Sequence, residues 1–182
     1  MRRVSVPSIG YASNRSPTRS DAAATTVDRM NRRTVGWLLV AAQVALFVVL
    51  ALLPWRTPSI ASIVLAIPFV VLGGWLGVAA FHALGSALTP TPVPIDGAGL
   101  RTSGPYSRIR HPIYTAVLSM TIAALIAAGS PWSWVWGVVI VVFFWGKSRW
   151  EDRLLAQEYG PEWSAWAQRT GALIPRRRRS AP

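Results

Sequence analysis

The sequence contains no cysteine in its 182 residues. This absence excludes disulfide bonds, thiolate metal ligands and cysteine nucleophiles, and it leaves the redox compartment undetermined. Charged residues are also scarce: they make up 14% of the chain, whereas about 25% is usual in a soluble domain. Hydrophobic residues account for 52%, and the charges lie mostly at the ends and in one central loop. This length and distribution predict a single domain embedded in a membrane.

Acidic residues are the rarer charge, 7 against 19 Lys and Arg, which gives a net charge of +12. A nucleic-acid-binding protein can be equally basic. Here, however, the basic residues flank apolar segments, where anionic lipid headgroups are the nearer partner. No aromatic residue interrupts the arginine run at 176–179. We therefore expect the basic tails to contact anionic lipids, and we expect no specific nucleic acid partner and no metal site.

Four apolar segments account for the hydrophobic content. They comprise residues 35–53, 60 to about 84, about 112 to 128, and 132–145. A helix of about 20 residues spans the hydrocarbon core of a bilayer. Three glycines in the second segment give it a smooth face for close helix packing. Gly129, Ser130 and Pro131 form a tight turn, which makes the last two segments a helical hairpin. The sequence therefore predicts an all-α integral membrane protein with about four transmembrane helices.

After the fourth segment the chain becomes amphipathic, which predicts an interfacial helical segment at the C-terminal end. Gly160 and Pro161 indicate a helix stop followed by a new helix start. Trp163 and Trp166 are interpreted as anchors at the membrane interface. In chain order we expect a disordered basic tail at 1–33 and then two transmembrane helices at 34–88. Residues 89–175 are expected to form the active site from a cytoplasmic loop, the helical hairpin and the C-terminal segment. A basic tail follows at 176–182.

The distribution of Lys and Arg predicts the topology. The tail to residue 33, the 89–111 loop and the segment after residue 145 together carry 18 of the 19 basic residues. Cytoplasmic segments are enriched in Lys and Arg, so these three parts and both termini are expected on the cytoplasmic side. The many Ala, Arg, Gly, Pro and Trp residues are typical of bacterial sequences. We therefore expect a multi-pass protein of the cell membrane, in bacteria the inner membrane.

Two polar segments stand out as candidates for chemistry. The first is GPYSRIRHPIY at residues 104–114. Pro112 suits the first turn of a helix, which places His111 at the helix entrance and Tyr114 near the same face. The unpaired N–H groups of that helix start favour an anion, and Arg110 could bind a carboxylate in bidentate fashion.

The second polar segment contains Lys147, Arg149, Glu151 and Asp152, just after the fourth apolar segment. The hairpin should make the two polar segments neighbours at the cytoplasmic interface. Ionisable groups at the edge of the hydrocarbon core cost free energy to bury, and they are therefore candidates for function. A plainer interpretation is also open. Arginines at helix ends are commonly topology anchors, as we expect for Arg153, and the acidic pair could simply balance the basic residues.

The order of these residues resembles the isoprenylcysteine carboxyl methyltransferase family, and the related phospholipid methyltransferases are similar. The resemblance covers residues 104–175 and implies an integral membrane methyltransferase that uses S-adenosylmethionine. It implies catalytic roles for Arg110, His111, Tyr114 and Glu151. It implies cofactor contacts from Gly104, Tyr106, Arg110, His111, Pro112, Tyr114, Glu151 and Asp152. The sequence departs from the family pattern at Asp152, Ala116 and Trp163, which leaves the acceptor open.

The resemblance implies methyl transfer to a lipid-like substrate, either an isoprenoid carboxylate or a phospholipid amine. Methyl transfer is an in-line displacement that requires alignment and exclusion of water. A carboxylate acceptor needs no general base, whereas an amine acceptor would need one, for which His111 and Glu151 are candidates. A sterol-reductase-like enzyme that uses NADPH is an alternative, because residues 159–163 resemble a Tyr-Gly-x-x-Trp segment. A non-catalytic membrane protein with the same scaffold is a third possibility.

Overall fold

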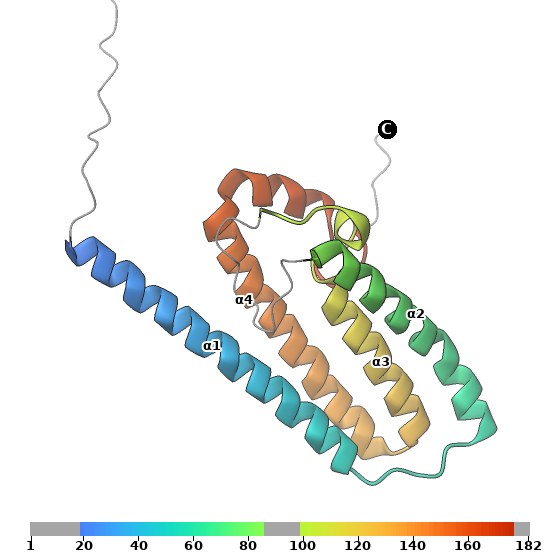
Figure 1. Cartoon of the computed structure of the whole chain (residues 1–182). Helices are drawn as coiled ribbons and strands as arrows, with labels where there is room; N and C mark the ends of the chain where they lie inside the picture. Colours follow the sequence, from blue (N-terminus) through green and yellow to red (C-terminus); the bar gives the residue numbers. More distant parts are fainter. Residues whose placement is uncertain (1–18, 86–98, 177–182) are drawn as a thin grey trace, which may run out of the picture.

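The computed structural model describes residues 19–85 and 99–176, with side chains from residue 30 onward (Figure 1). The described chain is helical, apart from an isolated bridge between Ile109 and Gly171. Its elements are α1 (Arg19–Leu52), α2 (Ile60–Leu84), the short 3-10 helix η2 (Gly104–Ser107), α3 (Pro112–Ala128) and α4 (Pro131–Arg169). The all-helical prediction is confirmed for these residues.

The second and third apolar segments form helices with the predicted bounds. Ser59 caps the start of α2, since its hydroxyl accepts a hydrogen bond from the Ser62 backbone N–H at 3.1 Å. Pro112 occupies the first turn of α3, where its missing N–H costs nothing. Gly129 ends α3 in the left-handed conformation, with a φ of 60°, and starts the predicted tight turn.

The first helix begins earlier than the sequence predicted. We expected a disordered tail up to residue 33, but α1 starts at Arg19. An apolar span already supplies a formed helix, and each residue added to its end gains one hydrogen bond without a new nucleation cost. Alanines at 22–24 have the highest helix propensity and favour that extension. Residues 1–18 of the predicted tail lie outside the described residues.

The fourth apolar segment is the beginning of a much longer helix. α4 runs from Pro131 to Arg169 and is interrupted at Gly160, where φ is 50° and ψ is −119°. Only glycine adopts that conformation readily, so the predicted stop and restart at Gly160 and Pro161 are confirmed. After the break, the chain turns across the end of the bundle toward η2 (Figure 1). The polar residues of α4 are therefore held on a continuous helix below this turn.

Helices α2 and α3 pack closely through small residues. A side chain at Gly73 would approach the Ala116 carbonyl oxygen to 2.9 Å, so only glycine allows this separation. The Ser119 hydroxyl adds a hydrogen bond of 2.8 Å to the Phe69 carbonyl. A side chain at Gly77 would also lie near α3, whereas one at Gly74 would meet nothing within 4 Å. Two of the three glycines of the predicted smooth face, Gly73 and Gly77, are thus covered by α3.

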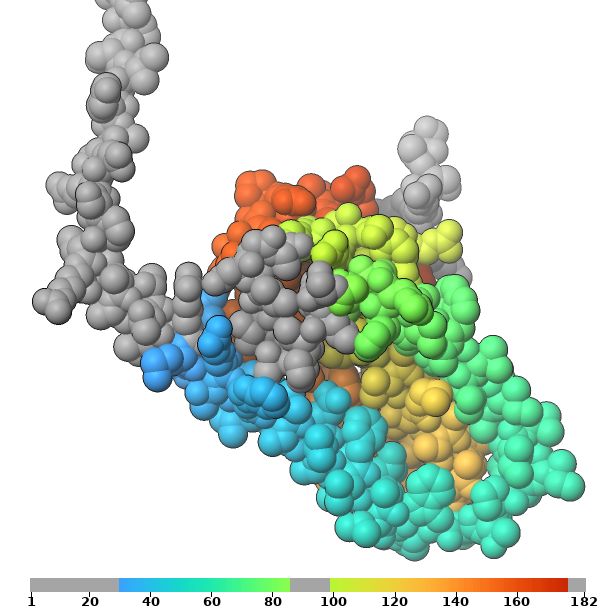
Figure 2. All heavy atoms as spheres, viewed as in Figure 1, coloured from blue at the N-terminus to red at the C-terminus, as the bar shows by residue number. Residues whose placement is uncertain are grey.

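Helices α1, α3 and α4 share a second apolar contact. Its buried members are Leu50, Leu125, Ile140 and Phe144. The Trp136 indole N–H adds a hydrogen bond of 2.8 Å to the Leu46 carbonyl of α1. At one end of the bundle the Arg56 N–H donates to the Ala128 carbonyl at 3.0 Å. This bond joins the short α1–α2 connection to the end of α3, where the short α3–α4 connection begins. The end of α4 and the segment around η2 cover the opposite end (Figure 2).

Two helices are long and apolar enough to cross a membrane, Met30–Leu52 and Ile60–Leu84. Only 11% and 22% of their most apolar stretches are buried within the protein. Large apolar side chains such as Trp37, Leu65 and Val138 lie on the surface of α1, α2 and α4. A water-soluble monomer rarely exposes apolar surface over several helices. This surface therefore supports a membrane location.

Candidate functional site

The two polar segments meet at the end of the bundle that η2 and the end of α4 cover. The Arg110 N–H donates to the Gly171 carbonyl at 2.8 Å, and the His111 N–H donates to the Ala172 carbonyl at 3.0 Å. The Gly171 N–H returns a hydrogen bond of 3.1 Å to the Arg108 carbonyl. These backbone bonds fix the entrance of α3 against the C-terminal segment. A side chain at Gly171 would collide with the Ile174 carbonyl oxygen, so this crossing requires glycine.

Arg110 and Asp152 form a bidentate ion pair. The Arg110 Nε and NH2 groups donate to the two Asp152 carboxylate oxygens at 3.1 and 2.9 Å. The NH1 group donates to the carbonyls of Ala167 and Thr170 at 3.3 and 2.8 Å. The side chains of Arg110 and Asp152 are 11% and 7% exposed. Most of the Arg110 N–H groups therefore bond to other protein groups, and these bonds tie α3, α4 and the C-terminal segment together.

His111 lies between the two carboxylates. Its Nε2 is 2.9 Å from Asp152 Oδ1, and its Nδ1 is 3.4 Å from Glu151 Oε2. Burial by itself lowers the pKa of His111, but Glu151 and Asp152 outweigh it and raise that pKa to about 9. The hydrogen bonds from His111 and Arg110 overcome the effect of burial on Asp152 and hold the pKa of that carboxyl below its usual value. At neutral pH His111 is therefore a cation that donates from both ring nitrogens.

Glu151 differs from Asp152 in having unused acceptor capacity. It accepts a hydrogen bond of 2.7 Å from the Tyr114 hydroxyl and faces His111 Nδ1 with the same oxygen. Its side chain is 23% exposed, against 7% for Asp152. The rings of His111 and Tyr114 are stacked, with centroids 5.3 Å apart and an angle of 8° between planes. Glu151 is thus the carboxylate of the cluster that a bound molecule can reach.

Aromatic side chains complete the end of the bundle near η2. The Trp166 indole N–H donates to the Tyr106 carbonyl at 2.9 Å, and both residues are buried. Burial, with a smaller contribution from Glu151, raises the pKa of the Tyr106 hydroxyl, which therefore stays protonated. The Trp163 ring lies 5.9 Å from the Arg110 guanidinium carbon, and its buried N–H has no partner among the described residues. Trp166 is therefore a packing residue of the site rather than the predicted interfacial anchor.

A connection from α1 was missed by the sequence analysis. The Lys147 ammonium donates to the Gln43 amide oxygen at 2.6 Å and lies 5.1 Å from the centroid of the Tyr114 ring. Lys147 is 4% exposed. The available signal was Gln43 itself, the one strongly polar residue of the first apolar segment, since a polar side chain within a span usually faces a protein partner.

The predicted site residues are brought together to different degrees. Arg110, His111, Tyr114, Glu151 and Asp152 form one connected network. Pro112 is buried in the first turn of α3 beside them. Gly104 is exposed and has a φ of 58°, so it serves the turn that places Tyr106. Arg149 is exposed and forms no hydrogen bond, ion pair or ring contact with a described residue, which fits a surface anchor.

Comparison with known families places this network in context. The phospholipid methyltransferase family matches residues 61–162, more than half of the 182-residue chain. The match begins in α2 and includes every member of the polar network. A comparison with the curated proteins found no match. The resemblance noted in the sequence is confirmed. The chain therefore belongs to the phospholipid methyltransferase family, and its two apolar helices make it a membrane methyltransferase.

Proposed function

We propose that the protein transfers a methyl group from S-adenosylmethionine to a lipid-like acceptor, a phospholipid amine or an isoprenoid carboxylate. The observation that carries this proposal is the arrangement around Glu151. The partly exposed Glu151 carboxylate contacts both members of a stacked His111–Tyr114 pair in an otherwise buried network. The site lies within the part of the chain that matches the family.

The polar groups that remain unpaired at the site fit S-adenosylmethionine, which carries a sulfonium cation, an amine and ribose hydroxyls. Glu151 can accept hydrogen bonds from the amine or a ribose hydroxyl, because its Oε1 has no hydrogen-bond partner among the described residues. The buried Trp163 N–H can donate to a carboxylate or a ring nitrogen. Arg110 and Asp152 were expected to contact the cofactor directly, but they already satisfy each other. We assign them to holding the site together.

When bound, the sulfonium supplies an activated methyl group for in-line displacement. The residues of the chain then have to align the acceptor and exclude water. Tyr114 fixes the Glu151 carboxylate through its hydroxyl, and the charged His111 faces the same oxygen with its Nδ1 at 3.4 Å. Preorganised groups of this kind need no rearrangement during reaction. His111 acts as a positioning donor in this scheme.

The raised pKa of His111 bears on the choice of acceptor. A histidine that is protonated at neutral pH cannot accept a proton, so it is unsuited to deprotonate an amine. Glu151 remains as the base for an amine acceptor, and a carboxylate acceptor needs no base. Methylation assays with phosphatidylethanolamine and with a farnesylated cysteine analogue distinguish the two. Loss of amine methylation in Glu151→Gln at an S-adenosylmethionine concentration that saturates the variant would support the base role.

We also propose four membrane crossings with both termini in the cytoplasm. α3 has 17 residues, which suffices for a helix packed among longer neighbours. The described residues of the basic segments lie toward the end of the bundle that carries the polar network, and the two short connections lie at the other (Figure 1). Labelling of single cysteines, introduced into this cysteine-free chain at Thr57 and Ser103, tests the arrangement. Ser103 should react only from the cytoplasmic side and Thr57 only from the other.

Calorimetry with the purified protein in nanodiscs tests cofactor use. Wild type should bind S-adenosylmethionine, and Glu151→Gln should weaken binding by about tenfold or more, as expected for a lost charge-assisted hydrogen bond. Glu158→Gln is the matched control, because Glu158 lies on the exposed face of α4. A folded wild type that binds no S-adenosylmethionine would contradict the proposal. Binding of NADPH instead would favour the reductase alternative.

A further inference from the structure

Lys147 and Glu151 lie about one helical turn apart on α4, because they are four residues apart in a continuous helix. A Lys and a Glu at this spacing commonly form an ion pair on a helix surface. No such pair is present among the described residues. Glu151 meets His111 and Tyr114 instead. The Lys147 ammonium turns to α1, where it donates to the Gln43 amide oxygen.

A few protein groups hold the Lys147 ammonium in this position. Its 2.6 Å bond to Gln43 is the one hydrogen bond that it forms with a described residue. The centroids of the Tyr114 and Phe144 rings lie 5.1 and 5.9 Å from its Nζ, and an aromatic face attracts a cation. Because Lys147 is only 4% exposed, water supplies little of the solvation that its charge needs. Its position therefore depends mainly on Gln43 and the two rings.

Glu151 is the alternative partner for this ammonium. Its charge already acts on Lys147, and its Oε1 has no hydrogen-bond partner among the described residues. The flexible four-carbon stem of a lysine reaches a carboxylate one turn away on the same helix. Without Gln43, the ammonium would be drawn to Glu151, because an unpaired buried charge is costly. The free carboxylate oxygen would then be occupied by Lys147.

We propose that Gln43 is a positioning residue, which holds the Lys147 ammonium away from Glu151 and so keeps that carboxylate open to the amine of S-adenosylmethionine. The inference rests on the proposed function, in which Glu151 binds the cofactor. Helix α1 ends before residue 61, where the match to the family begins. The inference therefore gives α1 a part in the site that goes beyond anchoring the protein.

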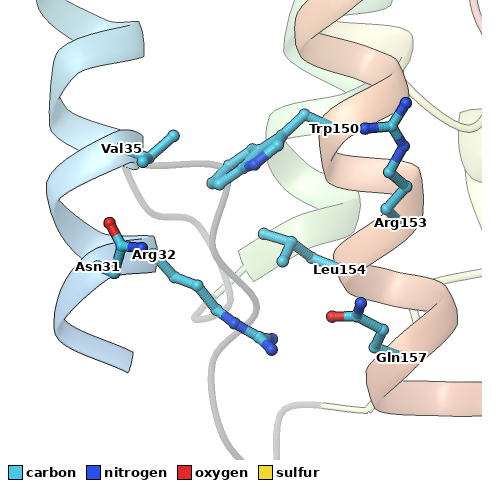
Figure 3. Close-up of a pocket in the computed structure, with 7 residues that line it drawn as sticks. All are labelled: Asn31, Arg32, Val35, Trp150, Arg153, Leu154 and Gln157. Carbon is cyan, nitrogen blue, oxygen red and sulfur yellow. The ribbon is translucent and has the colours of Figure 1, made fainter. Parts of the chain in front are cut away.

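The same helix offers a matched amide that does not contact Lys147. Nearer the start of α1, a groove of about 290 Å³ lies between α1 and α4 (Figure 3). Asn31 lines its α1 side, and Trp150, which directly precedes Glu151, lines its α4 side. Asn31 forms no hydrogen bond with a described residue. Asn31→Leu therefore removes an amide of α1 beside α4 and leaves the Lys147 ammonium where it is.

Calorimetry with the full-length protein in nanodiscs tests the positioning role. Gln43→Leu should bind S-adenosylmethionine about tenfold more weakly than wild type, as expected when a charge-assisted contact competes for Glu151. Adding Lys147→Met to Gln43→Leu should restore the affinity to within about threefold of wild type, because it removes the competing charge. Gln43→Glu, which keeps an acceptor for the ammonium, and the control Asn31→Leu should both bind as wild type does. Circular dichroism checks that each variant is folded.

Two results of this titration would overturn the inference. One is undiminished binding of S-adenosylmethionine by folded Gln43→Leu. The other is a double variant that binds no better than Gln43→Leu alone, because the loss would then come from disturbed packing and not from the freed ammonium of Lys147.

A second measurement separates this inference from the proposed function. Lys147→Met and Glu151→Gln, alone and combined, form a double-mutant cycle on the midpoint of thermal unfolding, measured without cofactor. The non-additive part of the midpoint shift should be larger in the Gln43→Leu background than in wild type, because the two charges then meet. Equal non-additivity in the two backgrounds would overturn the inference. A wild type that binds no S-adenosylmethionine would refute the proposed function, and the cycle would still decide whether Gln43 keeps the two charges apart.

Discussion

The ammonium of Lys147 in α4 donates a hydrogen bond of 2.6 Å to the amide oxygen of Gln43 in α1, 104 residues earlier in the chain. The same ammonium lies 5.1 Å from the centroid of the Tyr114 ring, whose hydroxyl bonds Glu151. The first helix is thereby connected to the candidate site through two side chains. A buried ammonium needs such partners, because an unpaired charge in the interior is costly.

Replacing Gln43 by Leu should destabilise the protein by about 1–3 kcal/mol, because the buried ammonium loses its hydrogen-bond acceptor. Unfolding in mixed micelles with increasing sodium dodecyl sulfate, followed by circular dichroism, measures the change. Val44→Ala is the control on the same helix, since the Val44 side chain is exposed. Equal stability of Gln43→Leu and wild type would show that the contact contributes nothing.

Replacing Arg110 by Lys should cost about 3 kcal/mol, even though the charge is kept. Lysine cannot supply the forked donors that bind Asp152 and the carbonyls of Ala167 and Thr170 together. The same unfolding measurement applies, with Arg108→Lys as the control because Arg108 is exposed. If Arg110→Lys matched Arg108→Lys, the ion pair would be dispensable for the fold.

The stability of wild type should fall as the pH rises from about 7 to 10. The pKa of His111 is raised from 6.5 to about 9 in the folded protein. The stabilisation from its protonated ring is complete below pH 6.5 and is lost as the pH passes through 9. The midpoint of thermal unfolding across this range should fall more steeply for wild type than for His111→Gln. Parallel curves for the two proteins would argue against a charged His111.

Replacing Gly171 by Ala should strongly reduce stability, because the new methyl group would collide with the Ile174 carbonyl oxygen and force the backbone to move. The shift would also disturb the hydrogen bonds that Arg110 and His111 make to residues 171 and 172. Gly146→Ala is the comparison, since a side chain there meets nothing within 4 Å and alanine favours a helix. Thermal unfolding of the two variants decides the matter, and equal behaviour would refute the predicted collision.

Much of the fold was predictable because it depends on local signals. Pro112 and Gly129 mark the ends of α3, and their effects on the backbone do not depend on distant residues. The start of α1 at Arg19 was not predicted. Its sequence lacks an apolar stripe, and the helix there continues from the span that follows it.

The sequence by itself determined the membrane character, the helix boundaries around the hairpin and the set of polar residues at the site. Each of these follows from residue type and spacing along one helix. Only the tertiary structure decided which role each of the two carboxylates has. Asp152 is neutralised by Arg110 and His111, whereas Glu151 keeps acceptor capacity. Two adjacent carboxylates look alike in sequence, but Asp152 meets Arg110 and His111 at the entrance of α3, whereas Glu151 meets Tyr114 and the other ring nitrogen of His111.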